Sequence, residues 1–167
     1  MNFSPVPKFS FPELTDVTPD FLVGLGIEFL MLDLDNTIAA YNEHLPSDEV
    51  ASWAASVRNK GIELYIISNS LRKDRCSTFA QELDVRVKMN AHKPSPKYVL
   101  QAISEAGYNS GNSALIGDQV FTDTLAANRA GICSIIVKPK QFTNPLLAIR
   151  YAAESPFRAM CKNSFSN

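Results

Sequence analysis

The chain has 167 residues, of which 46% are hydrophobic and 20% are charged, and its formal net charge is −1. This length and composition are typical of one soluble globular domain, which would bury about 70% of the surface of its unfolded chain. The near-neutral charge argues against nucleic acid as a partner, because nucleic-acid binding requires a basic surface.

The cysteines and the apolar runs indicate the cellular compartment of the protein. Cys76, Cys133 and Cys161 are widely spaced, form no metal-ligand pattern and indicate a reducing compartment. No apolar run approaches the ~18 residues that a membrane-spanning helix needs. Prolines between residues 5 and 12 interrupt any signal-peptide core. We therefore expect a cytoplasmic location.

The predicted elements alternate regularly along the chain. Residues 1–27 are expected to form an N-terminal arm, rich in proline and ending in a short helix from Pro19 to Leu25. Strands are expected near residues 28–33, 63–68, 85–89, 113–117 and 133–137. Helices are expected near residues 47–60, 73–83, 96–106 and 121–130. Strands separated by helices of this length are typical of βαβ units, so we predict an α/β fold with a doubly wound parallel sheet.

Residues 28–140 are expected to form the core and residues 141–167 a basic helical tail. From Lys138 onwards the chain holds five basic residues and one acidic residue, a net charge of +4. Asn144 and Pro145 predict an N-cap and the first turn of a helix that ends near Ala153. Basic and apolar residues interleaved in this tail predict peripheral contact with the inner face of a membrane. The alternative is that the helix packs on the sheet.

Polar residues follow the expected strands at their carboxyl ends, where open α/β sheets bind ligands. Asp33 and Asp35 end the apolar run at residues 29–32. The other residues of this kind are Ser68, Asn69, Lys93, Asp118, Gln119 and Asp123. Because all of them would reach one edge of one sheet, the sequence predicts a single catalytic site there.

The residue types suit phosphoryl transfer. Asp33 can attack phosphorus as an oxygen nucleophile. Mg²⁺ held by Asp33 and Asp118 would neutralise charge on the phosphoryl oxygens. Ser68 can donate a hydrogen bond to one of these oxygens, and Lys93 supplies a second positive charge. Asp35 is placed to protonate the leaving alcohol and then to deprotonate the water that hydrolyses the aspartyl phosphate.

In these motifs the chain resembles the haloacid dehalogenase (HAD) superfamily of phosphatases. Residues 33–37 match its DxDxT motif, and Ser68, Lys93 and the pair Asp118 and Asp123 match its later motifs. The resemblance covers roughly residues 28–137. It implies a HAD-like Rossmannoid core with Mg²⁺ as cofactor.

The resemblance also implies particular roles for the site residues. Asp35 would bind the metal through its backbone carbonyl, and Asp123 would support Lys93 more than it binds the metal. The residues expected to bind substrate are Asn36, Thr37, Asn69 and Gln119.

The loops leave no room for a cap domain. From Asp35 to Ser68 there are 33 positions, filled by one loop and one helix, and from Ser68 to Lys93 there is one helix and one strand. A site without a cap is open, which favours large substrates such as phosphorylated proteins, nucleic acids or lipids. An oligomer could also enclose the site.

Several short sequence motifs narrow the resemblance further. Ile-Ser-Asn-Ser, Ala-His-Lys-Pro and Ile-Gly-Asp-Gln-Val-Phe-Thr-Asp are similar to the YqeG-type branch of the capless HAD group. That branch is linked to phosphatidylglycerophosphate phosphatases, so the resemblance implies removal of a terminal phosphate during phospholipid biosynthesis.

Two alternatives stay open. The first is a HAD phosphatase that acts on a soluble or macromolecular phosphate, such as a nucleotide, a sugar or a phosphoprotein. The second is a receiver-like phosphoacceptor domain. A receiver carries its acidic pair and its acceptor aspartate on different strands, whereas Asp33 and Asp35 share one strand end, which favours the hydrolase.

Overall fold

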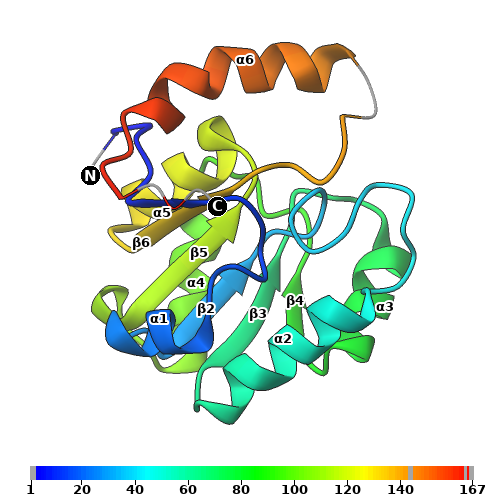
Figure 1. Ribbon diagram of the computed structural model, residues 1–167. Helices are drawn as coiled ribbons and strands as arrows, with labels where there is room; N and C mark the ends of the chain where they lie inside the picture. Colours follow the sequence, from blue (N-terminus) through cyan, green and yellow to red (C-terminus); the bar gives the residue numbers. More distant parts are fainter. Residues whose placement is uncertain (1–2, 143–144, 164, 166–167) are drawn as a thin grey trace.

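The computed structural model describes residues 3–142, 145–163 and 165. These residues form a parallel sheet with helices on both faces (Figure 1). The strands are β1 (Phe9–Phe11), β2 (Phe29–Leu32), β3 (Glu63–Ile67), β4 (Arg86–Lys88), β5 (Ser113–Gly117) and β6 (Cys133–Val137). The α-helices are α1 (Pro19–Gly24), α2 (Asp48–Asn59), α3 (Lys73–Glu82), α4 (Lys97–Ala106), α5 (Leu125–Ala130) and α6 (Pro145–Ala159). A 3₁₀ turn, η1 (Ser110–Asn112), precedes β5, and a π-helical turn, η2 (Val120–Thr124), precedes α5.

The strand order β1-β6-β5-β2-β3-β4 places β2 in the middle of the sheet. Leu32 of β2 pairs with Ile66 of β3 on one side and with Ile116 of β5 on the other, and all pairings are parallel. The chain moves outward to β4 and then crosses back to β5. The carboxyl end of β2 is therefore the switch point at which doubly wound sheets bind ligands. The predicted doubly wound parallel sheet without a cap domain is confirmed.

Alternate residues of β2 enter two separate hydrophobic clusters. Leu30 and Leu32 pack with residues of α1, α2 and α3, whereas Phe29 and Met31 pack with residues of α4 and α5. All four side chains are essentially inaccessible to solvent. This burial on both faces explains why the run Phe-Leu-Met-Leu shows no polar alternation.

The N-terminal residues contain a strand that the sequence analysis did not predict. β1 pairs in parallel with β6, from Phe9 with Ile135 to Phe11 with Val137. On the other side of β1, Ser10 donates its backbone N–H to the carbonyl of Asn163 and accepts a hydrogen bond from the N–H of Phe165. Residues that follow α6 thus cover the outer edge of β1.

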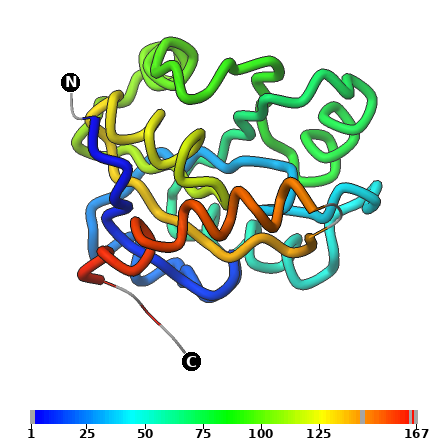
Figure 2. Tube along the Cα trace, turned by 90° about the horizontal axis from the view of Figure 1, so that it is seen from above, coloured from blue at the N-terminus to red at the C-terminus, as the bar shows by residue number. Residues whose placement is uncertain are grey.

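The C-terminal helix α6 lies across the carboxyl ends of the strands (Figures 1 and 2). Arg158 donates hydrogen bonds to the carbonyls of Val137 and Asp118, at the ends of β6 and β5. Glu154 is buried and accepts a hydrogen bond of 3.2 Å from the N–H of Phe121. The helix therefore docks on the domain through the buried Glu154 and the partly buried Arg158, which supports the packing alternative for its inner face.

Helix α6 is longer than the sequence predicts. It continues past Ala153 to Ala159 and holds Pro156 within it. The N-cap expected at Asn144 lies outside the described residues. In the described part of the chain, no helix combines the length and the apolar character needed to cross a membrane.

Candidate active site

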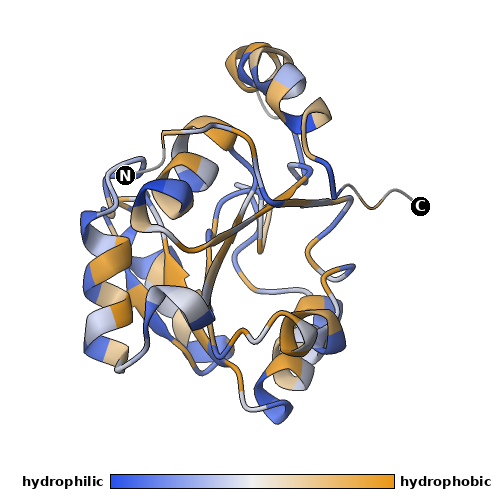
Figure 3. Cartoon of the chain, turned by 90° about the vertical axis from the view of Figure 1, so that its left-hand side faces the viewer, coloured by the Kyte–Doolittle hydropathy of each residue, from blue (hydrophilic) through white to orange (hydrophobic). Residues whose placement is uncertain are grey.

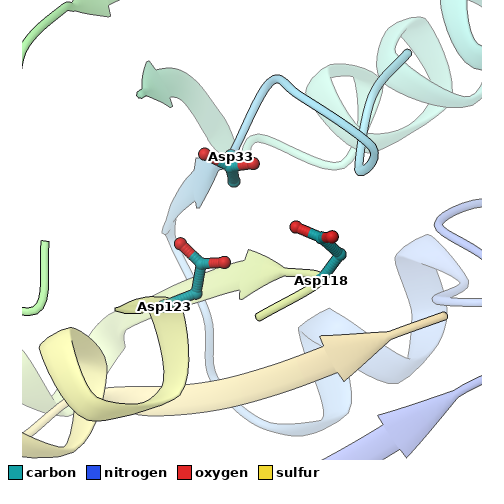
Figure 4. A group of neighbouring side chains, drawn as sticks. All are labelled: Asp33, Asp118 and Asp123. Atoms are coloured by element: carbon teal, nitrogen blue, oxygen red, sulfur yellow. The ribbon is translucent and has the colours of Figure 1, made fainter. Parts of the chain in front are cut away.

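Three aspartates converge where β2 and β5 end. Asp33 follows β2, Asp118 follows β5, and Asp123 lies on η2, and Figure 4 shows their carboxylates around a common space. One carboxylate oxygen from each lies within 4.8 Å of the others. All three residues are buried. Buried acids at this separation repel one another unless positive charge compensates them.

Lys93 supplies part of that positive charge from the loop after β4. Its Nζ lies 2.6 Å from Asp33 Oδ1 and 2.7 Å from Asp123 Oδ1, and it donates a hydrogen bond of 2.8 Å to the carbonyl of Ile67. The side chain is only 1% exposed. Burial alone would lower the pKa of Lys93, but Asp123 and Asp33 raise it above its ordinary value, so the amine stays protonated.

One lysine does not balance three carboxylates. Burial raises the pKa of Asp33 to about 7, although Lys93 opposes the shift. Burial and then the charge of Asp33 raise the pKa of Asp118 well above its ordinary value. Asp118 Oδ1 is also buried without a hydrogen-bond donor. The carboxylates thus lack compensating positive charge, and Asp118 Oδ1 lacks a partner at the same place. A divalent cation would supply both, because carboxylate oxygens bind such ions well.

Asp123 is less available to such a cation than the other two aspartates. Its Oδ1 faces Lys93, and its Oδ2 accepts a hydrogen bond of 3.1 Å from the N–H of Gln119. Asp33 and Asp118 are thus the two carboxylates best placed to hold the metal. Asp123 thus contacts Lys93 directly, and its supporting role stays a prediction.

Gly117 explains how Asp123 comes so close to the strand. A Cβ atom at position 117 would lie 2.3 Å from the carboxyl group of Asp123, far closer than atoms approach. The π-helical turn carries Asp123 back against the end of β5, and such turns are frequent at functional sites. The glycine before Asp118 is therefore required by close packing.

A cavity of about 60 Å³ adjoins Asp33. It is lined by Asp33, Asp35, Tyr41, Ser68, Asn69, Ser70, Gln119, Thr122 and Asp123. Typical ligand pockets measure ~300 Å³ or more, so only a small part of a substrate would enter this one. The remainder of the substrate would lie outside the cavity.

Ser68 and Asn69 take different positions at this cavity. The Ser68 hydroxyl is buried and accepts a hydrogen bond of 3.0 Å from the N–H of Ser70, which leaves its own proton for a ligand. Asn69 donates to the carbonyl of Lys93 at 2.9 Å and accepts from its N–H at 2.8 Å. Asn69 therefore holds the lysine loop in addition to lining the cavity.

Two of the expected substrate-binding residues do not line this cavity. Thr37 lines a different cavity of about 450 Å³, and Asn36 lies beneath α6 with Asp118 and Gln119. Asn36 has φ 63°, a left-handed conformation that asparagine tolerates better than most residues. Its N–H donates to the carbonyl of Ala39 at 2.7 Å, which closes the turn after β2. The structure thus gives Asn36 a place in the loop, and a contact of Asn36 or Thr37 with substrate stays a prediction.

Two residues near the cavity were not among the sequence candidates. Tyr41 lines the cavity, and burial raises the pKa of Tyr41 to about 12. Arg75 of α3 places Nη1 3.1 Å from Asp35 Oδ1. The sequence signal that could have identified Arg75 is its position on the inward face of α3, beside the buried Cys76 and Phe79.

Comparison with known proteins agrees with the fold and the site. A family model described as HAD-hydrolase-like matches residues 90–155, which include Lys93, Asp118 and Asp123. The cobalt-bound octulosonate 8-phosphate phosphatase of Haemophilus influenzae has a similar fold, with a TM-score of 0.57, 15% identity, and coverage of 86% of this chain and 80% of that one. The Moraxella catarrhalis enzyme of the same kind was solved with magnesium, phosphate and KDO. It has a TM-score of 0.58 and 16% identity, and the match covers 89% of this chain and 82% of that one.

The sheet, the buried acids and these matches make the chain similar to hydrolases of the HAD superfamily. Over 137 residues the chain is 28% identical to the probable phosphatase YqeG of Bacillus subtilis (strain 168), a match that covers 79% of each protein. The chain is thus similar to a probable phosphatase of the HAD type.

Proposed function

We propose that this phosphatase is a Mg²⁺-dependent phosphomonoesterase that forms an aspartyl phosphate on Asp33. The observation that carries the proposal is the position of Asp33, between the ammonium group of Lys93 and the carboxylate of Asp118, on the wall of a small cavity. Cobalt and magnesium in the two enzymes of similar fold support a divalent metal, and the acidic oxygen ligands favour Mg²⁺.

The reaction has two halves. In the first, an Asp33 oxygen attacks phosphorus, the bond from phosphorus to the leaving oxygen breaks, and the carboxyl proton of Asp35 passes to that oxygen. In the second, Asp35 takes a proton from a water whose oxygen attacks phosphorus. The bond to Asp33 then breaks, inorganic phosphate leaves, and both residues return to their starting states.

Other residues hold the reacting groups in place. Lys93 directs Nζ to Asp33, Asp123 and Ile67, so it fixes the nucleophile and compensates its charge. The Ser68 hydroxyl can donate to a phosphoryl oxygen. Mg²⁺ held by the carboxylates of Asp33 and Asp118, with the backbone carbonyl of Asp35, would neutralise charge on the phosphoryl oxygens.

For the substrate we propose the phosphate of a lipid head group, such as phosphatidylglycerophosphate. The small cavity without a cap supports this, because a substrate at a membrane surface can present its phosphate while its bulk stays in the membrane. On α6, Leu146 and Ile149 are 75% and 64% exposed, and Met160, which directly follows the helix, is 60% exposed. Figure 3 shows hydrophobic residues interspersed with hydrophilic ones along this helix. The outer face of α6 would thus face the membrane.

A phosphate-release screen tests both the proposed reaction and the proposed lipid substrate. The wild type and Asp33→Asn are compared in Mg²⁺ on soluble phosphomonoesters and on phosphatidylglycerophosphate in mixed micelles. We expect release by the wild type only, with the highest kcat/KM on the lipid. Release from no substrate would contradict the phosphomonoesterase, and a higher kcat/KM on a soluble nucleotide or sugar phosphate would contradict the lipid substrate alone.

A further inference from the structure

Arg75 is a buried cation that the proposed reaction does not use. Its side chain is 2% exposed. Its Nη1 lies 3.1 Å from Asp35 Oδ1, its Nη2 donates to the carbonyl of Ala40 at 2.7 Å, and its Nε donates to the carbonyl of Glu43 at 3.1 Å. The guanidinium also lies 4.8 Å from the centre of the Phe79 ring. With all three nitrogens in contact with a partner, the planar group has one fixed orientation.

The two oxygens of the Asp35 carboxylate are in different surroundings. Oδ1 is buried against Arg75, whereas the side chain as a whole is 15% exposed and lines the cavity beside Asp33. Oδ2 is therefore the oxygen available to a substrate. Among the described residues, Arg75 is the one side chain that forms an ion pair with Asp35. The direction in which Oδ2 points thus depends on the arginine.

We propose that Arg75 is a positioning residue that holds the Asp35 carboxylate with Oδ2 directed at the leaving oxygen of the substrate. The proposal rests on the acid–base role given above to Asp35. Arg75 does not touch the substrate and acts through Asp35. Because a misplacement of about 1 Å can lower a rate by ~100-fold, losing this contact should be costly where a proton must be delivered.

The choice of leaving group separates positioning from general structural damage. An alkyl phosphate such as glycerol 3-phosphate needs a proton on its leaving oxygen, whereas p-nitrophenolate leaves without one. The measured quantity is the rate at which glycerol or p-nitrophenol is released in the first turnover. This rate reports phosphorylation of Asp33 and excludes the later hydrolysis. For Arg75→Ala we expect this rate to fall by about 100-fold on glycerol 3-phosphate and by less than about 10-fold on p-nitrophenyl phosphate.

Asp35→Asn should show the same dependence on the leaving group. The double variant should be no slower than Asp35→Asn alone, because both changes remove one function. Arg75→Lys keeps a positive charge but loses the planar fork, so an intermediate rate on glycerol 3-phosphate is expected. This second variant also keeps the test valid if Arg75→Ala folds poorly, which its Tm would reveal.

Arg72 provides a matched control. It is exposed, lies just before α3, and donates a hydrogen bond of 3.0 Å to the carbonyl of Tyr41, so it contacts the same loop without reaching Asp35. Arg72→Ala should leave both rates nearly unchanged. Equal losses on the two substrates in Arg75→Ala, or the same selective loss in Arg72→Ala, would overturn the positioning role while the phosphatase proposal stands. A wild type that releases phosphate neither from these two substrates nor from phosphatidylglycerophosphate would overturn both proposals.

Discussion

Asp123 and Lys93 form a buried ion pair, with 2.7 Å between Oδ1 and Nζ, and Gly117 leaves the space that the aspartate occupies. The pair aligns Lys93 toward Asp33. Lys93→Ala should lower kcat by at least about 100-fold, and Asp123→Asn by about 10-fold, because the asparagine still occupies the site. A double-mutant cycle measured with kcat/KM should show coupling between the two changes. Strict additivity would mean that Asp123 acts independently of Lys93.

Asp33→Asn should abolish turnover and preserve the fold. An amide does not attack phosphorus effectively, and the metal loses a charged ligand, so kcat should fall by several powers of ten. Phosphate release gives the rate, and circular dichroism and Tm give the fold. Retention of more than about a hundredth of the wild-type kcat would reject Asp33 as the nucleophile.

Mg²⁺ should support activity and Ca²⁺ should inhibit it. Mg²⁺ requires octahedral geometry and keeps several waters, whereas Ca²⁺ takes more oxygens and can bind both oxygens of one carboxylate. With Asp33 bound in that way, its attacking oxygen would be occupied. The measurement is phosphate release with each ion and with excess chelator. Equal rates in Mg²⁺ and Ca²⁺, or full activity in chelator, would contradict the proposed role of the metal.

Stability of the metal-free protein should fall as the pH rises. The pKa of Asp33 is about 7 in the folded protein against an ordinary value of 3.8. At Asp33 the folded state therefore binds more protons than the unfolded state between these values, so the contribution of Asp33 to stability is greatest below about pH 4 and declines through about pH 7. Tm measured in EDTA at several pH values should show this decline.

Mg²⁺ should reverse that pH trend, since it binds only the ionised carboxylates. Its stabilising effect on Tm should thus grow between pH 5 and about pH 7.5, over the range in which Asp33 ionises. Asp118→Asn is the control, because it removes one acid of the buried group and should flatten both trends. A Tm in EDTA that rises through this range would exclude the proposed titration.

The outer face of α6 should bind anionic membranes weakly. Apolar side chains at Leu146 and Ile149 would enter the surface, and each basic residue near an anionic leaflet contributes about 1 kcal/mol. Co-sedimentation with anionic vesicles should occur at low salt and weaken once the Debye length falls to about 8 Å or less. Replacing both residues by serine should reduce it, whereas Leu100→Ser, an exposed leucine on α4, should not. No binding at low salt would remove the main support for a lipid substrate.

Much of the sheet and the place of the site could be predicted from the sequence. The run at residues 29–32 is apolar without alternation, and this is the pattern that burial on both faces requires. Once the strands are parallel, their carboxyl ends meet, so Asp33, Ser68 and Asp118 had to lie at one edge. The order of these residues along the chain was therefore enough to predict a common site.

Features that depend on contacts between distant segments could not be predicted in this way. β1 has three residues in a proline-rich stretch, and only its pairing with β6 makes it a strand. Arg75 lies on a helix whose pattern is that of any amphipathic helix. Its role depends on the path of the loop at residues 40–43, which no local pattern specifies. The docking of α6 through the buried Glu154 likewise depends on the position of Phe121.

The pairing of β1 with β6 bears on how the protein is made. Lys8 and Ser134, which are hydrogen-bonded across this pair, stand 126 positions apart. β1, the first strand to leave the ribosome, therefore cannot pair until β6, the last strand of the sheet, has been synthesised. Until then β1 has neither β6 on one side nor residues 163 and 165 on the other. Long-range pairings of this kind slow folding and leave strand edges open to aggregation, so a chaperone that shields nascent chains should raise the yield of folded phosphatase.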